Sequence, residues 1–98
     1  MAKKVIWTNR AKSDRLAIFD YWTQRNKSKA YSIKLHLLFQ EATKIISQYP
    51  EIGKPTSEAN VKMKIVRDYL MFYEILSHQI FILTIWDSRQ NPQKITLK

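Results

Sequence analysis

Lys62 and Lys64 are the residues of this sequence whose type and spacing best suit chemistry on a charged ligand. They lie in the segment 61–65, where apolar residues alternate with the two lysines, and Arg67 follows just beyond. This period of two is typical of a strand with one polar face, and it places both ammonium groups about 7 Å apart on that face. The spacing suits successive phosphates of a nucleic-acid backbone. The same pattern also fits an ordinary solvated strand face, so both interpretations stay open.

A second group of candidates follows a strongly apolar segment near the end of the chain. Trp86, Asp87 and Arg89 bring an indole, a carboxylate and a guanidinium to a predicted surface turn. Arg89 is able to grip a phosphate or to stabilise developing negative charge. Alternatively, Asp87 and Arg89 form a weak exposed ion pair that fixes the loop. The candidate contacts to a target are therefore Lys62, Lys64, Arg67, Trp86, Asp87 and Arg89.

No established catalytic arrangement accompanies these cations. His78 is expected in a hairpin loop, and His36 is expected to face solvent because it falls off the apolar stripe of its helix. Glu74 lies in an apolar strand, either buried or on the open face of the sheet. With two histidines and no cysteine, the chain lacks the usual donors of a zinc site, so no metal and no cofactor are expected. Whether the protein is an enzyme therefore stays open.

Composition and charge set the class of protein. Ninety-eight residues predict a single domain over residues 1–98, and 45% hydrophobic residues are enough for a folded core. Seventeen Lys and Arg stand against eight Asp and Glu, a net charge of +9 that favours nucleic acid, an anionic membrane face or an acidic protein as partner. The longest uncharged stretch, 75–86, is shorter than the ~20 residues of a spanning helix. No signal-peptide core opens the chain, so a cytoplasmic location without membrane insertion is expected.

Two helices are predicted in the first half of the chain. A short strand at 3–7 precedes a helix over 11–25, which Thr8 or Asn9 can cap. Asn26 or Ser28 caps the second helix, and Pro50 ends it. The stripe expected to face the core of the second helix comprises Tyr31, Leu35, Leu38, Ala42, Ile45 and Tyr49, widened by Phe39 and Ile46.

Strands are predicted in the second half, over 61–65, 70–76 and 80–86, with a hairpin loop at 77–79. The last of these is apolar on both faces except at Thr84, which places it inside the sheet. The two helices are the only available cover. The fold class is therefore α+β, with the order β-α-α-β-β-β and an antiparallel sheet covered on one face by a helical hairpin.

Several short motifs, in this order, resemble the RelE/ParE family of toxins over nearly the whole chain. They are Ala11, Asp14, Ile18 and Tyr21 on the first helix, then segments 49–55, 65–67, 69–75 and 86–92. The resemblance implies the same β-α-α-β-β-β fold. It also implies a growth-inhibiting toxin that forms a hetero-oligomer with a cognate acidic antitoxin.

The target that the resemblance implies depends on the branch of the family. RelE-like members cut mRNA in the ribosome, whereas ParE-like members block DNA gyrase and are not nucleases. Lys62 and Lys64 stand where RelE-type toxins carry strand lysines, and Arg89 lies near their C-terminal-strand arginine. However, Leu70 replaces an expected arginine, and no tyrosine follows Arg89. Of the two branches, the resemblance thus favours the ParE-like one and implies gyrase inhibition. The alternatives are mRNA cleavage by Lys62, Lys64, Arg67 and Arg89, and a non-toxic binding module that kept the fold.

Overall fold

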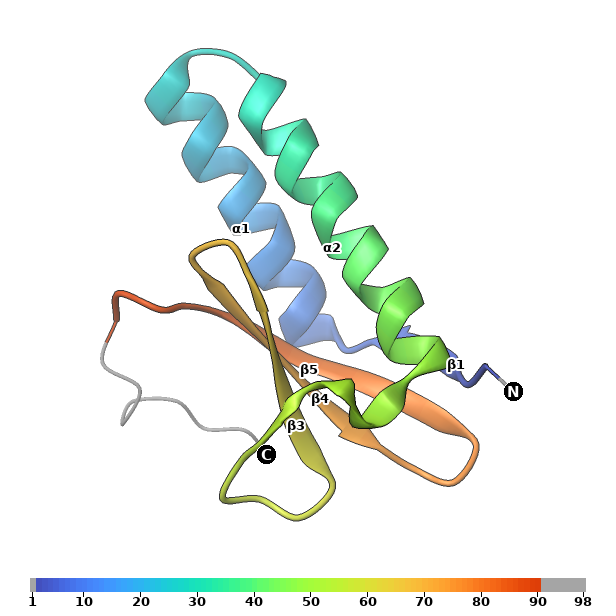
Figure 1. The fold of residues 1–98 in the computed structure, drawn as a ribbon. Helices are drawn as coiled ribbons and strands as arrows, with labels where there is room; N and C mark the ends of the chain where they lie inside the picture. The colour runs from blue at the N-terminus through green and yellow to red at the C-terminus, as the bar shows by residue number, and fades with distance from the viewer. Residues whose placement is uncertain (1, 91–98) are drawn as a thin grey trace.

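Two helices pack against one face of a five-stranded sheet in the computed structural model, which describes residues 2–90 (Figure 1). The strand order across the sheet is β1-β5-β4-β3-β2. The predicted α+β class is confirmed, with the two-residue strand β2 as an addition. In chain order the elements are β1 (Lys4–Trp7), α1 (Asn9–Asn26), α2 (Ala30–Gln48), a 3-10 turn (Pro50–Ile52), β2 (Lys54–Pro55), β3 (Val61–Val66), β4 (Tyr69–Ile75) and β5 (Gln79–Asp87).

The sheet is mixed, whereas the sequence predicted an antiparallel one. Tight turns join β3 to β4 and β4 to β5, which forces these three strands to alternate in direction. No such turn links β1 to β5, and the two strands run parallel, with Lys4 opposite Gln79 and Trp7 opposite Ile82. Strand β5 therefore lies between β1 and β4, and this interior position explains why it is apolar on both faces.

The helical hairpin begins and ends close to the predicted residues. Thr8 caps α1 as predicted, because its Oγ1 accepts a hydrogen bond from the backbone N of Ala11 at 3.2 Å. Lys27, in the left-handed region with φ 51°, ends α1. The N-cap residue of α2 is Lys29, and not Asn26 or Ser28 as predicted, although Ser28 Oγ accepts a hydrogen bond from the N–H of Ala30. Neither helix within residues 2–90 is long and apolar enough to cross a membrane.

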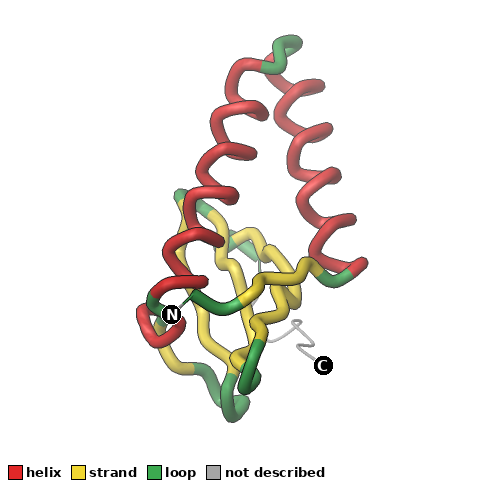
Figure 2. The backbone as a smooth tube through the Cα atoms, turned by 90° about the vertical axis from the view of Figure 1, so that its right-hand side faces the viewer, coloured by secondary structure: helices red, strands yellow, loops and turns green. Residues whose placement is uncertain are grey.

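The buried stripe of α2 is rotated from the predicted one. Leu35 and Ala42 are buried as expected, but Phe39 and Ile46, predicted only at the margin, occupy its centre together with Ser32. Tyr49, predicted to be inside, is 63% exposed because it lies beyond the last turn of the helix. The buried apolar residues of this stripe form one core with buried residues of the central strands. Figure 2 shows that the loop end of the hairpin extends beyond the sheet.

The side chains of β3 point opposite to the predicted directions. Lys62 pairs with Tyr73 and Lys64 with Met71, and both partners belong to the helix-covered core. Cross-strand partners share a face, so both lysines lie on the helix side of the sheet. Ile65, predicted to be inside, is 49% exposed, whereas the next residue, Val66, is buried. Strand β3 lies at the margin of the helical cover, where lysine stems can pack while their ammonium groups reach water.

Candidate functional site

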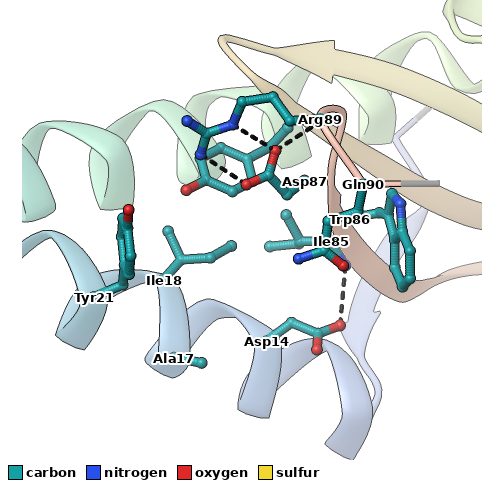
Figure 3. A pocket seen from close by; sticks show the side chains of 10 residues that line it. Asp14, Ala17, Ile18, Tyr21, Ile85, Trp86, Asp87, Arg89 and Gln90 are labelled. Carbon is teal, nitrogen blue, oxygen red and sulfur yellow. Dashed lines mark hydrogen bonds and ion pairs between the residues drawn. The ribbon is translucent and has the colours of Figure 1, made fainter. Parts of the chain in front are cut away.

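A cavity of about 530 Å³ opens between α1 and the end of β5, and it holds part of the second group of candidate residues. In Figure 3, Tyr21 on α1 and Trp86 on β5 lie on opposite sides of the cavity, and Arg89 and Asp87 lie together above it. We call this cavity the β5-end pocket. Its lining residues are Asp14, Ala17, Ile18, Tyr21, Tyr69, Ile85, Trp86, Asp87, Arg89 and Gln90.

Asp14 fixes the wall of this pocket that α1 supplies. Its Oδ2 accepts two hydrogen bonds from β5, one from the hydroxyl of Thr84 and one from the backbone N of Ile85 at 3.2 Å. Thr84 is 1% exposed, so its hydroxyl has no access to water as an alternative partner. The bonds lie beside a β-bulge, where the register between β4 and β5 shifts at Phe72 and Tyr73. Asp14 therefore joins α1 to an irregular point of the sheet.

Asp87 and Arg89 form a bidentate pair at the mouth of the pocket. The guanidinium donates from Nε to Oδ1 at 3.0 Å and from Nη2 to Oδ2 at 2.7 Å, and the backbone N of Arg89 donates to Oδ1 at 2.9 Å. The side-chain bond from Arg89 is the main reason that the pKa of Asp87 lies below its ordinary value, and the same bond raises the pKa of Arg89. The guanidinium of Arg89 is thus paired with a carboxylate, although the side chain of Arg89 is 56% exposed.

The aromatic residues of the pocket lining are Tyr21, Tyr69 and Trp86. The indole Nε1 of Trp22 donates to the hydroxyl of Tyr69 at 2.8 Å, and burial raises the pKa of that hydroxyl. Trp86 is half-buried, and its Nε1 is a buried donor without a hydrogen-bond partner. The pocket therefore combines flat apolar surfaces with one charged pair, and this combination suits the binding of a ligand or of a partner's side chain.

The remaining cations lie apart from this pocket. Lys62 forms an ion pair with Glu51, with 3.2 Å between Nζ and Oε1, so its ammonium group has an anionic partner in the structure. Lys64 and Arg67 line a separate hollow of about 250 Å³ beside α2, together with Glu41. Arg67 belongs to the β3–β4 turn and has φ 58°. The structure thus distributes the six candidate residues over three places instead of gathering them.

Neither histidine lies in the β5-end pocket. His78 occupies the β4–β5 turn, as predicted. His36, predicted to face solvent, is half-buried instead: its Nε2 lies 3.2 Å from Nη2 of Arg15, a nitrogen that also donates to the backbone oxygen of His36. Arg15 in turn lies 4.6 Å from the centre of the Trp7 ring. Within residues 2–90 no group of three or more His, Asp or Glu side chains is placed to hold a metal ion.

Sequence reasoning missed Tyr21, Tyr69 and the role of Asp14 in this site. Thr84 supplied a signal, because a single polar residue in an otherwise apolar strand requires a buried partner. Asp14 was the acidic residue of the first-helix motif, but the sequence does not reveal which helix face meets β5. Asn91 and Pro92, part of the terminal motif, lie outside the described residues.

Removing the guanidinium of Arg89 is expected to raise the pKa of Asp87 toward its ordinary value of 3.8. A carboxyl whose pKa is lowered by folding stabilises the protein above the unfolded pKa and loses that contribution as pH falls through the folded pKa. The wild-type pair therefore contributes near neutral pH and weakens only in acid below about pH 4. Carboxyl-carbon NMR titration of Asp87 in the wild type and in Arg89→Gln checks this. An unchanged midpoint in the variant contradicts the assigned cause.

The fold, a helical hairpin on one face of a mixed sheet, is shared with solved toxin–antitoxin proteins. A chain titled "Chromosomal ParDE TA system from P. aeruginosa" matches with a TM-score of 0.77 and 20% identity, covering 88% of this chain and 96% of that chain. The toxin–antitoxin complex RelBE2 from Mycobacterium tuberculosis matches with a TM-score of 0.60 and 17% identity, covering 89% and 99%. At these identities the likeness concerns the fold.

The family of this chain is identified by the match of its sequence to a family model. The model of the ParE toxin of the type II toxin–antitoxin system parDE matches residues 5–92, which is most of the chain. No curated protein matches the chain closely enough to add to this. The protein belongs to the ParE toxin family.

Proposed function

We propose that this ParE-family toxin arrests growth by binding and inhibiting DNA gyrase inside the cell. The match to the ParE family over residues 5–92 is the observation that carries the proposal. The β5-end pocket, with its aromatic walls and engaged ion pair, is the proposed contact surface for the target. Trp86, Asp87 and Arg89 are its proposed contact residues.

The placement of the cations supports inhibition by binding over cleavage of RNA. Lys62 and Arg67 are five residues apart along β3 and its turn, a separation of about 16 Å for extended chain. Lys62 is paired with Glu51 and Arg89 with Asp87, so two of the four proposed nuclease cations already have anionic partners. A phosphoryl-transfer site needs its charged groups aimed at one reacting phosphate.

The second candidate function is ribosome-dependent cleavage of mRNA. Lys62 and Lys64 favour it, because they lie on the same face of one strand, as a backbone-binding pair must. In that case Arg67 and Arg89 act with them. The fold shared with the RelBE2 complex is compatible with this function.

We further propose a cognate acidic antitoxin as the partner that stores the toxin harmlessly. The net charge of +9 favours an anionic cover through long-range attraction, and the two solved structures named above come from toxin–antitoxin systems. A hetero-oligomer of toxin and antitoxin follows. We expect no cofactor for either proposed function.

The incorporation of labelled thymidine and of labelled methionine, followed in the minutes after induction without antitoxin, tests the target. We expect thymidine incorporation to fall first. The variant Lys62→Ala/Lys64→Ala is expected to arrest growth with the same order and with a potency within about twofold of wild type, because both side chains lie at the margin of the sheet. Early collapse of methionine incorporation, lost in the double variant, contradicts gyrase inhibition and supports mRNA cleavage.

A further inference from the structure

The tip of the helical hairpin carries several basic residues and no acidic residue. We define the hairpin tip as residues 24–34, the end of α1, the connecting loop and the start of α2. It contains Arg25, Lys27, Lys29 and Lys34, and no acidic residue occurs between Asp20 and Glu41. All four cationic residues are exposed. Figures 1 and 2 both show the tip standing clear of the sheet, at the far end of the hairpin.

These charges are not neutralised within the described part of the chain. No ion pair within residues 2–90 engages Lys27, Lys29 or Lys34. Arg25 lies over the ring of Trp22, 5.9 Å from its centre, which orients the guanidinium without cancelling its charge. The tip thus differs from β3 and β5, where Lys62 and Arg89 have carboxylate partners.

The four cations lie close enough together to act on one ligand. Arg25 and Lys27 are two residues apart at the end of α1, and Lys29 and Lys34 span about 8 Å along the axis of α2. Mutual repulsion at such short range disfavours the fold slightly. An extended anion that contacts all four removes this repulsion and gains from the release of its own counterions.

The remaining side chains of the tip select the kind of anion. Residues 24–30 contain no large apolar side chain, and Ile33 is the single exposed one in the tip, at 49%. An acidic protein partner requires an apolar centre in its interface, and an anionic membrane requires an apolar face to insert. Neither is present. Gln24, Asn26 and Ser28 instead alternate with the cations and supply neutral donors, the combination that contacts phosphate oxygens of nucleic acid.

We propose that the hairpin tip binds the phosphate backbone of double-stranded DNA without reading its sequence. The inference deepens the proposed function, since the substrate of gyrase is duplex DNA, and the tip then holds the DNA while the β5-end pocket contacts the enzyme. The pocket is centred on the end of β5, and the tip is the far end of the hairpin (Figure 1). The two surfaces adjoin on α1, where Tyr21 of the pocket lies one helical turn from Arg25 of the tip.

Fluorescence anisotropy with a labelled linear duplex, the full-length toxin and no gyrase tests this directly. Four phosphate contacts predict that log K falls with log salt with a slope of about −3.6. The variant Lys27→Gln/Lys29→Gln/Lys34→Gln should reduce the slope to about −1 and weaken binding at low salt by at least about tenfold. The matched control is Lys4→Gln/Lys44→Gln/Lys54→Gln, which removes the same charge from three other exposed lysines. It should change the slope by less than about 1.

Three results overturn the inference: absence of duplex binding by the wild type at low salt, equal loss in the two triple variants, or preference for single-stranded RNA over duplex DNA. Circular dichroism of both variants verifies that the hairpin is intact. Inhibition of gyrase measured on the same samples separates the two proposals. Gyrase inhibition without DNA binding by the tip removes this inference and leaves the proposed function. DNA binding by the tip without gyrase inhibition removes the proposed function and leaves this inference.

Discussion

Replacing Asp14 with alanine is expected to lower the free energy of unfolding by about 3 kcal/mol, a large share of the stability of a small domain. The substitution removes the acceptor shared by the Thr84 hydroxyl and the Ile85 backbone N. Thr84 and Ile85 are 1% and 4% exposed, so the two donors are left in the core without partners. An unsatisfied buried donor costs more than the mean value of a hydrogen bond, because its desolvation is no longer offset.

Urea denaturation of matched variants measures this effect. Asp20→Ala removes a carboxylate from the exposed face of the same helix and should change the free energy of unfolding by less than about 0.5 kcal/mol. In the Thr84→Val background, Asp14→Ala should cost less than in the wild type, since one of its two partners is already gone. Equal costs for the Asp14 and Asp20 variants contradict the role assigned to Asp14 in holding α1 against β5.

The second large effect is expected at Gly53, the only glycine of the chain. Its N–H donates to the hydroxyl of Tyr73 at 3.0 Å, and that hydroxyl donates to the backbone oxygen of Pro50 at 2.7 Å. A Cβ at position 53 stands 2.5 Å from the Tyr73 hydroxyl and 2.9 Å from the backbone oxygen of Met63. Glycine is required here by the close approach of these atoms and not by the backbone conformation, because a φ of −73° is accessible to any residue. Gly53→Ala is expected to cost about 2–3 kcal/mol.

The variant Tyr73→Phe tests the same contact by changing the tyrosine instead of the glycine. It leaves the Gly53 N–H and the Pro50 oxygen without their partner and is expected to cost about 1–3 kcal/mol. The double variant Gly53→Ala/Tyr73→Phe should cost less than the sum, because the methyl group then meets no hydroxyl. Ser57→Ala, in the exposed loop before β3, serves as the control. Strict additivity in urea denaturation is the outcome that contradicts a clash between these two residues.

The helical hairpin and the order of helices and strands along the chain were predictable because their signals are local. Apolar spacing, the Thr8 cap and Pro50 each act within a few residues and define α1 and α2 closely. The direction of β1 was not predictable from the same signals. Parallel or antiparallel pairing of β1 with β5 depends on the path of the chain over the sheet, and no tight turn between them fixes it.

The directions of the β3 side chains were mispredicted, because alternation of apolar and polar residues does not say which face of the sheet the helices cover. Lysines on the helix side are tolerated where the cover ends, and Lys62 gains a partner from the 3-10 turn at Glu51. The β5-end pocket shows the same limit. Asp87 and Arg89 are close in sequence and were expected as a possible pair, which is present, whereas Asp14, Tyr21 and Tyr69 join them only through tertiary packing.

Inhibition of DNA supercoiling by purified gyrase tests the central claim most directly. The toxin, added without antitoxin to gyrase, ATP and relaxed plasmid, is predicted to stop the appearance of supercoiled product and to leave gyrase-linked cleaved DNA. Prior addition of the proposed acidic antitoxin should restore supercoiling. Full supercoiling at toxin concentrations that cleave mRNA on isolated ribosomes contradicts the claim, and it assigns Lys62, Lys64, Arg67 and Arg89 to a nuclease instead.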